Sequence, residues 1–195
     1  MQRQANITSR FLVAVILLLP WLNPFAGGPT PSVVPWLVSA ACFSVFMIFV
    51  LVRRIDAVAA VGSTLLAAAV ISSAIALLQY FGAAAPLAPW INIPSAGEAF
   101  ANLRQRNQFA TLTAIGMVAL LWFVRRHKAA VVARGAVYRS AWSSALSALS
   151  AQTTLPVMAV VLLAFGNAAS SSRTGMLQLV LVIALFCSQA ASACR

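Results

Sequence analysis

Long apolar stretches alternate with short polar segments along almost the whole chain. About 20 helical apolar residues cross the hydrocarbon core of a bilayer, so each long stretch predicts one membrane helix. The first four stretches lie at residues 7–25, 33–52, 57–81 and 109–124. The fifth ends near residue 169, and a Ser/Ala-rich stretch at 140–154 is expected to join it. The sixth runs from residue 174 to about 191. The pattern therefore predicts an all-α, polytopic membrane bundle of about six transmembrane helices, forming a single domain over residues 1–195.

The first apolar stretch has a competing interpretation as a secretory signal peptide, because basic residues precede it. Its apolar run, however, continues through Trp21 into a Gly-Gly-Pro-Thr-Pro turn, and no small-x-small cleavage pattern stands at the expected place. We therefore interpret it as a membrane helix.

Composition agrees with a membrane protein, since 62% of the 195 residues are hydrophobic and 8% are charged. A soluble domain of this length needs far fewer apolar residues for its core. The net charge of +11 does not indicate a nucleic-acid partner, because the basic residues form short clusters between apolar runs instead of one soluble face. The three cysteines show no CxxC or His/Cys spacing, so the sequence predicts neither a metal site nor a disulfide framework.

The clusters of basic residues predict the orientation, because cytoplasmic loops carry an excess of Lys and Arg. With a cytoplasmic N-terminus, the inside holds ten of the thirteen basic residues, namely Arg3, Arg10, Arg53, Arg54, Arg125, Arg126, Lys128, Arg134, Arg139 and Arg195. The outside holds Arg104, Arg106 and Arg173. Aromatic residues agree, with Trp21, Trp36, Tyr80 and Trp90 at outer helix ends and Trp122 and Trp142 at inner ends. Both termini are therefore predicted to be cytoplasmic.

Arg104 and Arg106 flank Gln105 immediately before a predicted helix. The first turn of a helix has unpaired backbone N–H groups and carries the positive end of the helix dipole. Positive charge and hydrogen-bond donors thus lie together, as they do in an anion-binding site. The planar guanidinium group of arginine can donate two hydrogen bonds to the oxygens of one phosphate. Asn107 is a candidate helix cap or ligand contact, and Glu98 is a candidate partner for one arginine. Snorkelling of both arginines to lipid headgroups is the alternative that the spacing leaves open.

A second polar segment, Ser170-Ser171-Ser172-Arg173-Thr174-Gly175, precedes the last predicted helix. Ser172 or Thr174 is expected to be an ordinary N-cap. Arg173 is different, because a cation at a helix N-terminus opposes the macrodipole unless an anion or carboxylate offsets it. Since the fourth and sixth predicted helices both start outside, Arg104, Arg106 and Arg173 are expected to border one outward-facing site.

Catalytic chemistry is not evident. His127 is the only histidine and falls in a cytoplasmic basic segment, and the predicted topology puts Asp56, suited to a helix N-terminus, and Glu98 on opposite faces. The chain has no GxSxG motif, P-loop or carboxylate cluster for a divalent metal. We assign no catalytic residue, metal or cofactor, and interpret Gly166 and the alanines of the third stretch as packing positions.

Three motifs together resemble the N-terminal half of bacterial O-antigen ligases, specifically the protein-glycosylating O-oligosaccharyltransferase branch. They are Trp90-Ile91-Asn92-Ile93-Pro94, the run from Phe100 to Ala110 (FANLRQRNQFA), and Ser172-Arg173-Thr174-Gly175. Members of that family are more than twice as long, and the histidine thought to activate the acceptor lies in a large periplasmic loop later in their sequence. Nothing here corresponds to that loop, so we expect an N-terminal fragment that is inactive alone.

The resemblance implies a multi-pass protein of the bacterial inner membrane that transfers oligosaccharide from an undecaprenyl-pyrophosphate carrier to a periplasmic hydroxyl. It assigns Arg104, Arg106 and Arg173 to the pyrophosphate, and Gln105 and Asn107 to positioning. The acceptor is either a periplasmic protein or the lipid A core, and membrane lipids are the other partners. A transporter or flippase fragment and a non-catalytic membrane subunit are the alternatives.

Overall fold

The computed structural model describes residues 2–23, 33–53, 56–95, 97–103, 105–133 and 151–193. These residues form six α-helices and one short 3₁₀ helix, without any strand in the described ranges. The elements are α1 (Gln2–Leu22), α2 (Val33–Arg53), α3 (Ala57–Tyr80), η2 (Ala85–Leu87), α4 (Arg106–Ala133), α6 (Ala151–Ala169) and α7 (Arg173–Ala193). The all-α prediction is therefore confirmed for the described part of the chain.

Three helices are long and apolar enough to cross a membrane, over Val33–Val52, Ala57–Tyr80 and Arg106–Arg126. Shorter apolar helical segments occupy Phe11–Leu22, Thr154–Ala169 and Arg173–Leu185. The apolar stretches of the sequence thus correspond to helices, while six complete crossings and cytoplasmic termini stay predictions. Most of the Ser/Ala-rich stretch at 140–154 lies outside the described residues.

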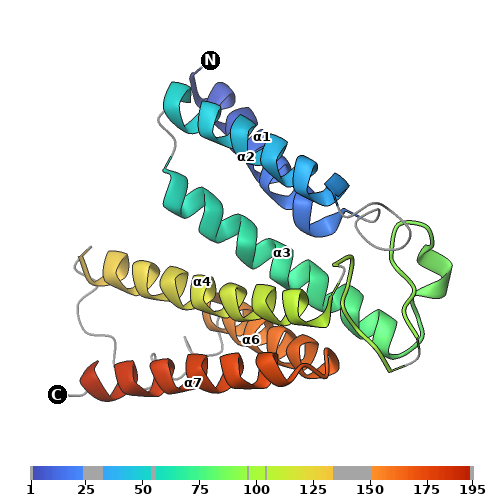
Figure 1. The fold of residues 1–195 in the computed structure, drawn as a ribbon. Coiled ribbons are helices and arrows are strands. Elements are labelled where there is room, and N and C mark those ends of the chain that lie inside the picture. Colours follow the sequence, from blue (N-terminus) through green and yellow to red (C-terminus); the bar gives the residue numbers. More distant parts are fainter. Residues whose placement is uncertain are drawn as a thin grey trace.

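Helix α3 lies in the middle of the bundle, where it packs against α1, α4 and α6. Helix α2 packs on α1 at one edge, and α7 packs on α4 and α6 at the other. Figure 1 shows the start of α1 and the end of α7 at the same end of the bundle. The connection between Tyr80 and Arg106 and the turn between Ala169 and Arg173 lie at the opposite end, which we call the loop end.

Small residues let the central helices approach closely. Ala68, Ala69 and Ala76 of α3 are fully buried. A Cβ placed on Gly166 of α6 would come within 2.7 Å of the Cβ of Ser73 on α3, so no larger residue fits there without moving a helix. Close packing through small residues is the usual way in which membrane helices associate. The predicted packing role is thus confirmed for Gly166 and for Ala68, Ala69 and Ala76, whereas Ala74 of the same helix is exposed.

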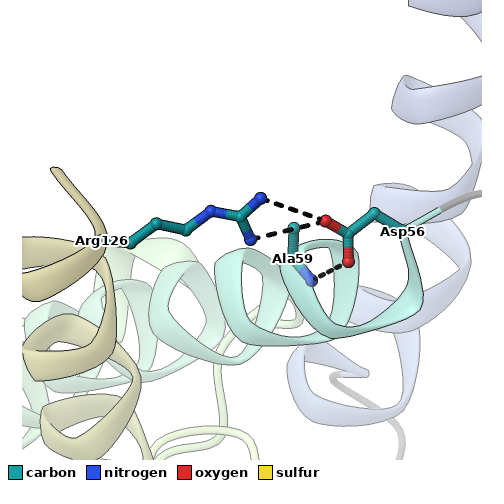
Figure 2. A network of polar contacts seen from close by, with 3 residues as sticks. All are labelled: Asp56, Ala59 and Arg126. Carbon is teal, nitrogen blue, oxygen red and sulfur yellow. Dashed lines mark hydrogen bonds and ion pairs between the residues drawn. The ribbon is translucent and has the colours of Figure 1, made fainter. Parts of the chain in front are cut away.

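The start of α3 carries a capped and paired carboxylate (Figure 2). Asp56 is the N-cap residue, and its Oδ1 accepts a hydrogen bond from the Ala59 N–H at 3.1 Å. Both terminal nitrogens of Arg126 on α4 lie 3.4 Å from Asp56 Oδ2. These contacts lower the pKa of Asp56, first through the backbone N–H and then through the arginine charge. The suggestion that Asp56 suits a helix N-terminus is confirmed.

Candidate functional site

Helix α4 begins at the loop end with Arg106. The first hydrogen bond into the helix runs from the Phe109 N–H to the Gln105 carbonyl, at 3.2 Å. Gln105 therefore stands where a cap residue would, and Asn107 is the second residue inside the helix, so the suggestion that Asn107 caps α4 is wrong. Arg104 lies outside the described residues. The side chains of Gln105, Arg106 and Asn107 are exposed.

Helix α7 also begins at the loop end, with Arg173 as its first residue. Ser172 caps it, because its Oγ accepts a hydrogen bond from the Gly175 N–H at 3.2 Å and its carbonyl accepts one from the Met176 N–H. The expectation of an ordinary serine cap is confirmed at Ser172. The side chain of Arg173 is exposed beside this cap.

Direct side-chain contacts hold the two helix starts together. Ser172 Oγ donates to Asn107 Oδ1 at 2.8 Å, and one turn further along, Gln178 Nε2 donates to Thr111 Oγ1 at 3.2 Å. Helices α4 and α7 consequently run parallel with their N-termini level. Arg106 precedes one member of the Asn107–Ser172 pair, and Arg173 follows the other. The structure thus brings these two predicted site residues to the same edge of the loop end.

A buried polar cluster lies next to the contact between the starts of α4 and α7 and stabilises it. Asn167 of α6 donates to Thr113 Oγ1 of α4 at 2.8 Å, and both side chains are almost fully buried. Ser170 Oγ donates to the Asn167 carbonyl at 2.6 Å and accepts from the Ser172 N–H at 3.3 Å. The sequence interpretation overlooked Asn167, although an amide late in an apolar stretch is itself a sign of a helix contact.

The chain before α4 is fixed by a second buried amide. Gln79, in the last turn of α3, donates to the carbonyls of Asn92 and Ala101, each at 2.8 Å. Its Oε1 accepts from the N–H groups of Phe100 and Ala101. Ala101 has a φ of 54°, a left-handed conformation that costs free energy in a residue other than glycine. The four bonds of Gln79 stabilise this turn, which leads directly into Arg106.

Asn102 completes the framework of the loop end. Its Oδ1 accepts from the Asn92 N–H at 3.1 Å, while its Nδ2 donates to the carbonyls of Leu22 and Trp90. The end of α1, the loop after α3 and the segment before α4 are therefore joined through one amide. The sequence motif that contains Asn102 does not reveal this role, because the partners of its amide lie 10 to 80 residues away.

Arg106 is only weakly compensated at this end. Its guanidinium lies 3.9 Å from Glu98 Oε1, and both side chains are exposed. An exposed ion pair of this length contributes at most about 1 kcal/mol. The expectation that Glu98 partners one arginine is confirmed for Arg106, but the contact leaves the guanidinium open to another anion.

An open groove adjoins the start of α4. It has a volume of about 660 Å³, which is within the usual size range of ligand pockets. Its lining residues come from three helices and the turn before α4: Pro20, Trp21, Pro35, Trp36, Ser39, Leu103, Gln105, Asn107, Gln108 and Thr111. One wall is therefore aromatic and apolar, and the other is an uncharged polar surface beside Arg106.

No group of three or more His, Cys, Asp or Glu side chains gathers within the described residues in a way that would hold a metal ion. The charged side chains at the loop end that the structure describes are Arg106, Arg173 and Glu98. This arrangement suits the binding of an anionic group, with the arginines and the helix starts as donors.

A model of the protein glycosylation ligase family matches residues 99–123. The matched segment contains the turn that Gln79 and Asn102 hold, the start of α4 with Gln105, Arg106 and Asn107, and most of its apolar length. Comparisons with curated proteins and with solved structures gave no match. Over this short segment, the chain is thus similar to protein glycosylation ligases, and its apolar helices indicate a membrane protein.

Proposed function

We propose that this chain binds the lipid-linked donor of a membrane glycan ligase at the loop end. The donor is an oligosaccharide on undecaprenyl pyrophosphate, and the acceptor is a hydroxyl of a periplasmic protein or of the lipid A core. The proposal places the protein in the bacterial inner membrane with the loop end facing the periplasm. The observation that carries it is the Asn107–Ser172 hydrogen bond, which sets two arginine-bearing helix starts side by side.

The pyrophosphate would lie against the starts of α4 and α7. Arg106 and Arg173, together with Arg104, supply positive charge, and charge develops on the pyrophosphate as the glycan leaves it. Gln105 and Asn107 position the group. Because Asn107 Oδ1 already accepts from Ser172, the amide offers its N–H donors to a ligand, and donors are what phosphate oxygens require. The groove beside Trp21 and Trp36 gives the lipid portion an apolar wall next to this polar surface.

Acceptor activation needs a base within hydrogen-bond reach of the attacking hydroxyl. Among the described ionisable residues at the loop end, Glu98 is the one carboxylate, and it faces Arg106. We therefore assign the described residues to donor binding and none of them to catalysis. The described site alone does not account for transfer.

Donor binding can be measured directly with the chain in lipid nanodiscs. Undecaprenyl pyrophosphate and undecaprenyl monophosphate serve as ligands for Arg106→Lys, Arg173→Lys and the parent chain. Lysine keeps the charge but loses the fork of donors, so one charged hydrogen bond of about 1.5 kcal/mol, or about tenfold in affinity, should disappear at each position. Arg126→Lys is the matched control, because Arg126 lies on the same helix and pairs with Asp56 at the opposite end.

Preference for the pyrophosphate, reduced by both loop-end variants and unaffected by the control, would support the proposal. Equal affinity for both lipids, unchanged in either variant, would contradict the proposal. It would support the alternative that Arg106 and Arg173 only reach toward lipid headgroups. Weak binding of both lipids, without any preference for the pyrophosphate over the monophosphate, would favour a transporter or a non-catalytic subunit.

A further inference from the structure

The loop that follows α3 is uncharged and carries large apolar side chains on its surface. No charged residue occurs from Phe81 to Gly97. Three side chains in this part are more than half exposed, Phe81 at 76%, Trp90 at 68% and Ile93 at 59%, and Leu87 in η2 is exposed as well. A loop that stands in water would normally carry polar side chains at such positions.

The hydrogen bonds of two buried amides fix the depth of this loop along the bundle. Asn102 Nδ2 donates both to the Trp90 carbonyl at 3.0 Å and to the carbonyl of Leu22, the last residue of α1, at 3.1 Å. Gln79, in the last turn of α3, holds the Asn92 carbonyl at 2.8 Å. The backbone at residues 90–92 therefore lies level with the ends of α1 and α3, and does not project far beyond them.

We propose that residues 81–94 rest in the interface of the bilayer leaflet at the loop end, with Leu87, Trp90 and Ile93 inserted between lipid headgroups and acyl chains. Helix α3 is long and apolar enough to cross the membrane, so its last turn marks the interfacial depth. Tryptophan is enriched at that depth because its ring is amphipathic. Insertion also removes exposed apolar area from water without burying any charge.

The end of the inserted segment coincides with the first charges. Ser95 is exposed, and Glu98 follows it and pairs with Arg106. Charged groups stay at the aqueous side of an interface because a charge inside the hydrocarbon is costly. The chain thus passes from a lipid-embedded part before residue 95 to an aqueous part that leads to the start of α4. A lipid surface fits this pattern better than a polypeptide partner, because the loop lies level with the last turn of α3, a helix long and apolar enough to cross a membrane.

Spin labels test the proposal on the full chain in nanodiscs. Cys42, Cys187 and Cys194 are replaced by alanine, and a single nitroxide is attached at Leu87→Cys, Ile93→Cys or Ser95→Cys. Collision with oxygen, which concentrates in lipid, is compared with collision with a water-soluble nickel chelate. We expect the labels at 87 and 93 to respond mainly to oxygen, and the label at 95 to respond mainly to the chelate.

A second comparison uses the Ile93 label with a substitution at Trp90. Trp90→Asp should shift this label toward the nickel chelate, because the aspartate cannot enter the interface, whereas Trp90→Phe should leave it in lipid. Labels at 87 and 93 that respond to the chelate as strongly as the label at 95 would overturn the proposal. Labels shielded from both reagents would also overturn it, because protein and not lipid would then cover the loop. Neither result depends on donor binding at Arg106 and Arg173.

Discussion

Replacement of Ser172 by alanine should destabilise the protein, because its hydroxyl makes two hydrogen bonds at the loop end. Ser172 Oγ accepts from the Gly175 N–H and so caps α7, and it also donates to Asn107 Oδ1 across the helix interface. The residue is nearly buried, so water does not readily replace either partner. One substitution therefore removes a cap and a helix–helix contact together.

The two losses differ in size. A serine cap contributes about 1 kcal/mol to stability, and a side-chain hydrogen bond between membrane helices about 0.6 kcal/mol. Ser172→Ala should thus cost about 1.5 kcal/mol. Asn107→Ala removes only the shared bond, and the higher helix propensity of alanine, by up to about 0.7 kcal/mol, nearly cancels that cost. The double variant isolates the shared bond, with an expected coupling energy of about 0.6 kcal/mol.

Unfolding by SDS in lipid bicelles, followed by tryptophan fluorescence, gives the free energies for the four proteins of this cycle. Ser44→Ala is the control, because the Ser44 hydroxyl bonds only the Ala40 carbonyl of its own helix α2, and its change should stay within about 0.5 kcal/mol. Two results would refute the reasoning. They are a coupling energy of zero, and a Ser172→Ala cost no larger than that of the control.

Three further predictions concern topology, acid stability and chemistry. A cysteine at Ser95 should react with a membrane-impermeant reagent from the periplasmic side, and one at Ser140 should not; the reverse pattern would invert the orientation. The lowered pKa of Asp56 means that its stabilisation is present above the ordinary aspartate pKa and is lost as pH falls through the lowered value. Unfolding at and below about pH 4 should therefore depend less on pH in Asp56→Asn, which keeps the cap but loses the charge facing Arg126; an unchanged acid profile would contradict this. The 195-residue chain, given a lipid-pyrophosphate glycan and an acceptor, should transfer nothing, whereas transfer abolished by Glu98→Gln would identify Glu98 as the base.

Features that depend on neighbouring residues were predictable from the sequence. The apolar stretches became helices because hydropathy and length decide helix formation in a bilayer. The caps at Asp56 and Ser172 were predictable because each side chain bonds an N–H three residues ahead. Such local features can be predicted without knowing how the helices pack.

Contacts between helices could not be predicted in the same way. The bonds from Asn167 to Thr113 and from Ser172 to Asn107 join residues 54 and 65 positions apart, and which faces meet depends on the packing of the whole bundle. Gln79 has nothing beside it in the sequence that would reveal four bonds to residues 13 to 22 positions later. For the same reason the sequence suggests Asn107 as a cap of its own helix, whereas its side-chain oxygen accepts a hydrogen bond from Ser172 beside α7.

Two arginines of α4, Arg106 and Arg126, differ in their partners, and the difference explains why Arg106 is suited to bind a ligand. Arg106 and Arg126 stand about 30 Å apart along the helix, given its rise per residue. Arg126 directs two nitrogens at Asp56 and lies over the ring of Trp122 at 5.0 Å, so its charge faces a carboxylate and two of its nitrogens have an acceptor. Arg106 has one contact with Glu98 at 3.9 Å, beyond hydrogen-bond range. Its donors therefore remain to be satisfied by water or by an anion, at the end where a second helix begins with Arg173. The pyrophosphate of the proposed donor carries several oxygens, and it could therefore accept hydrogen bonds from more than one guanidinium group.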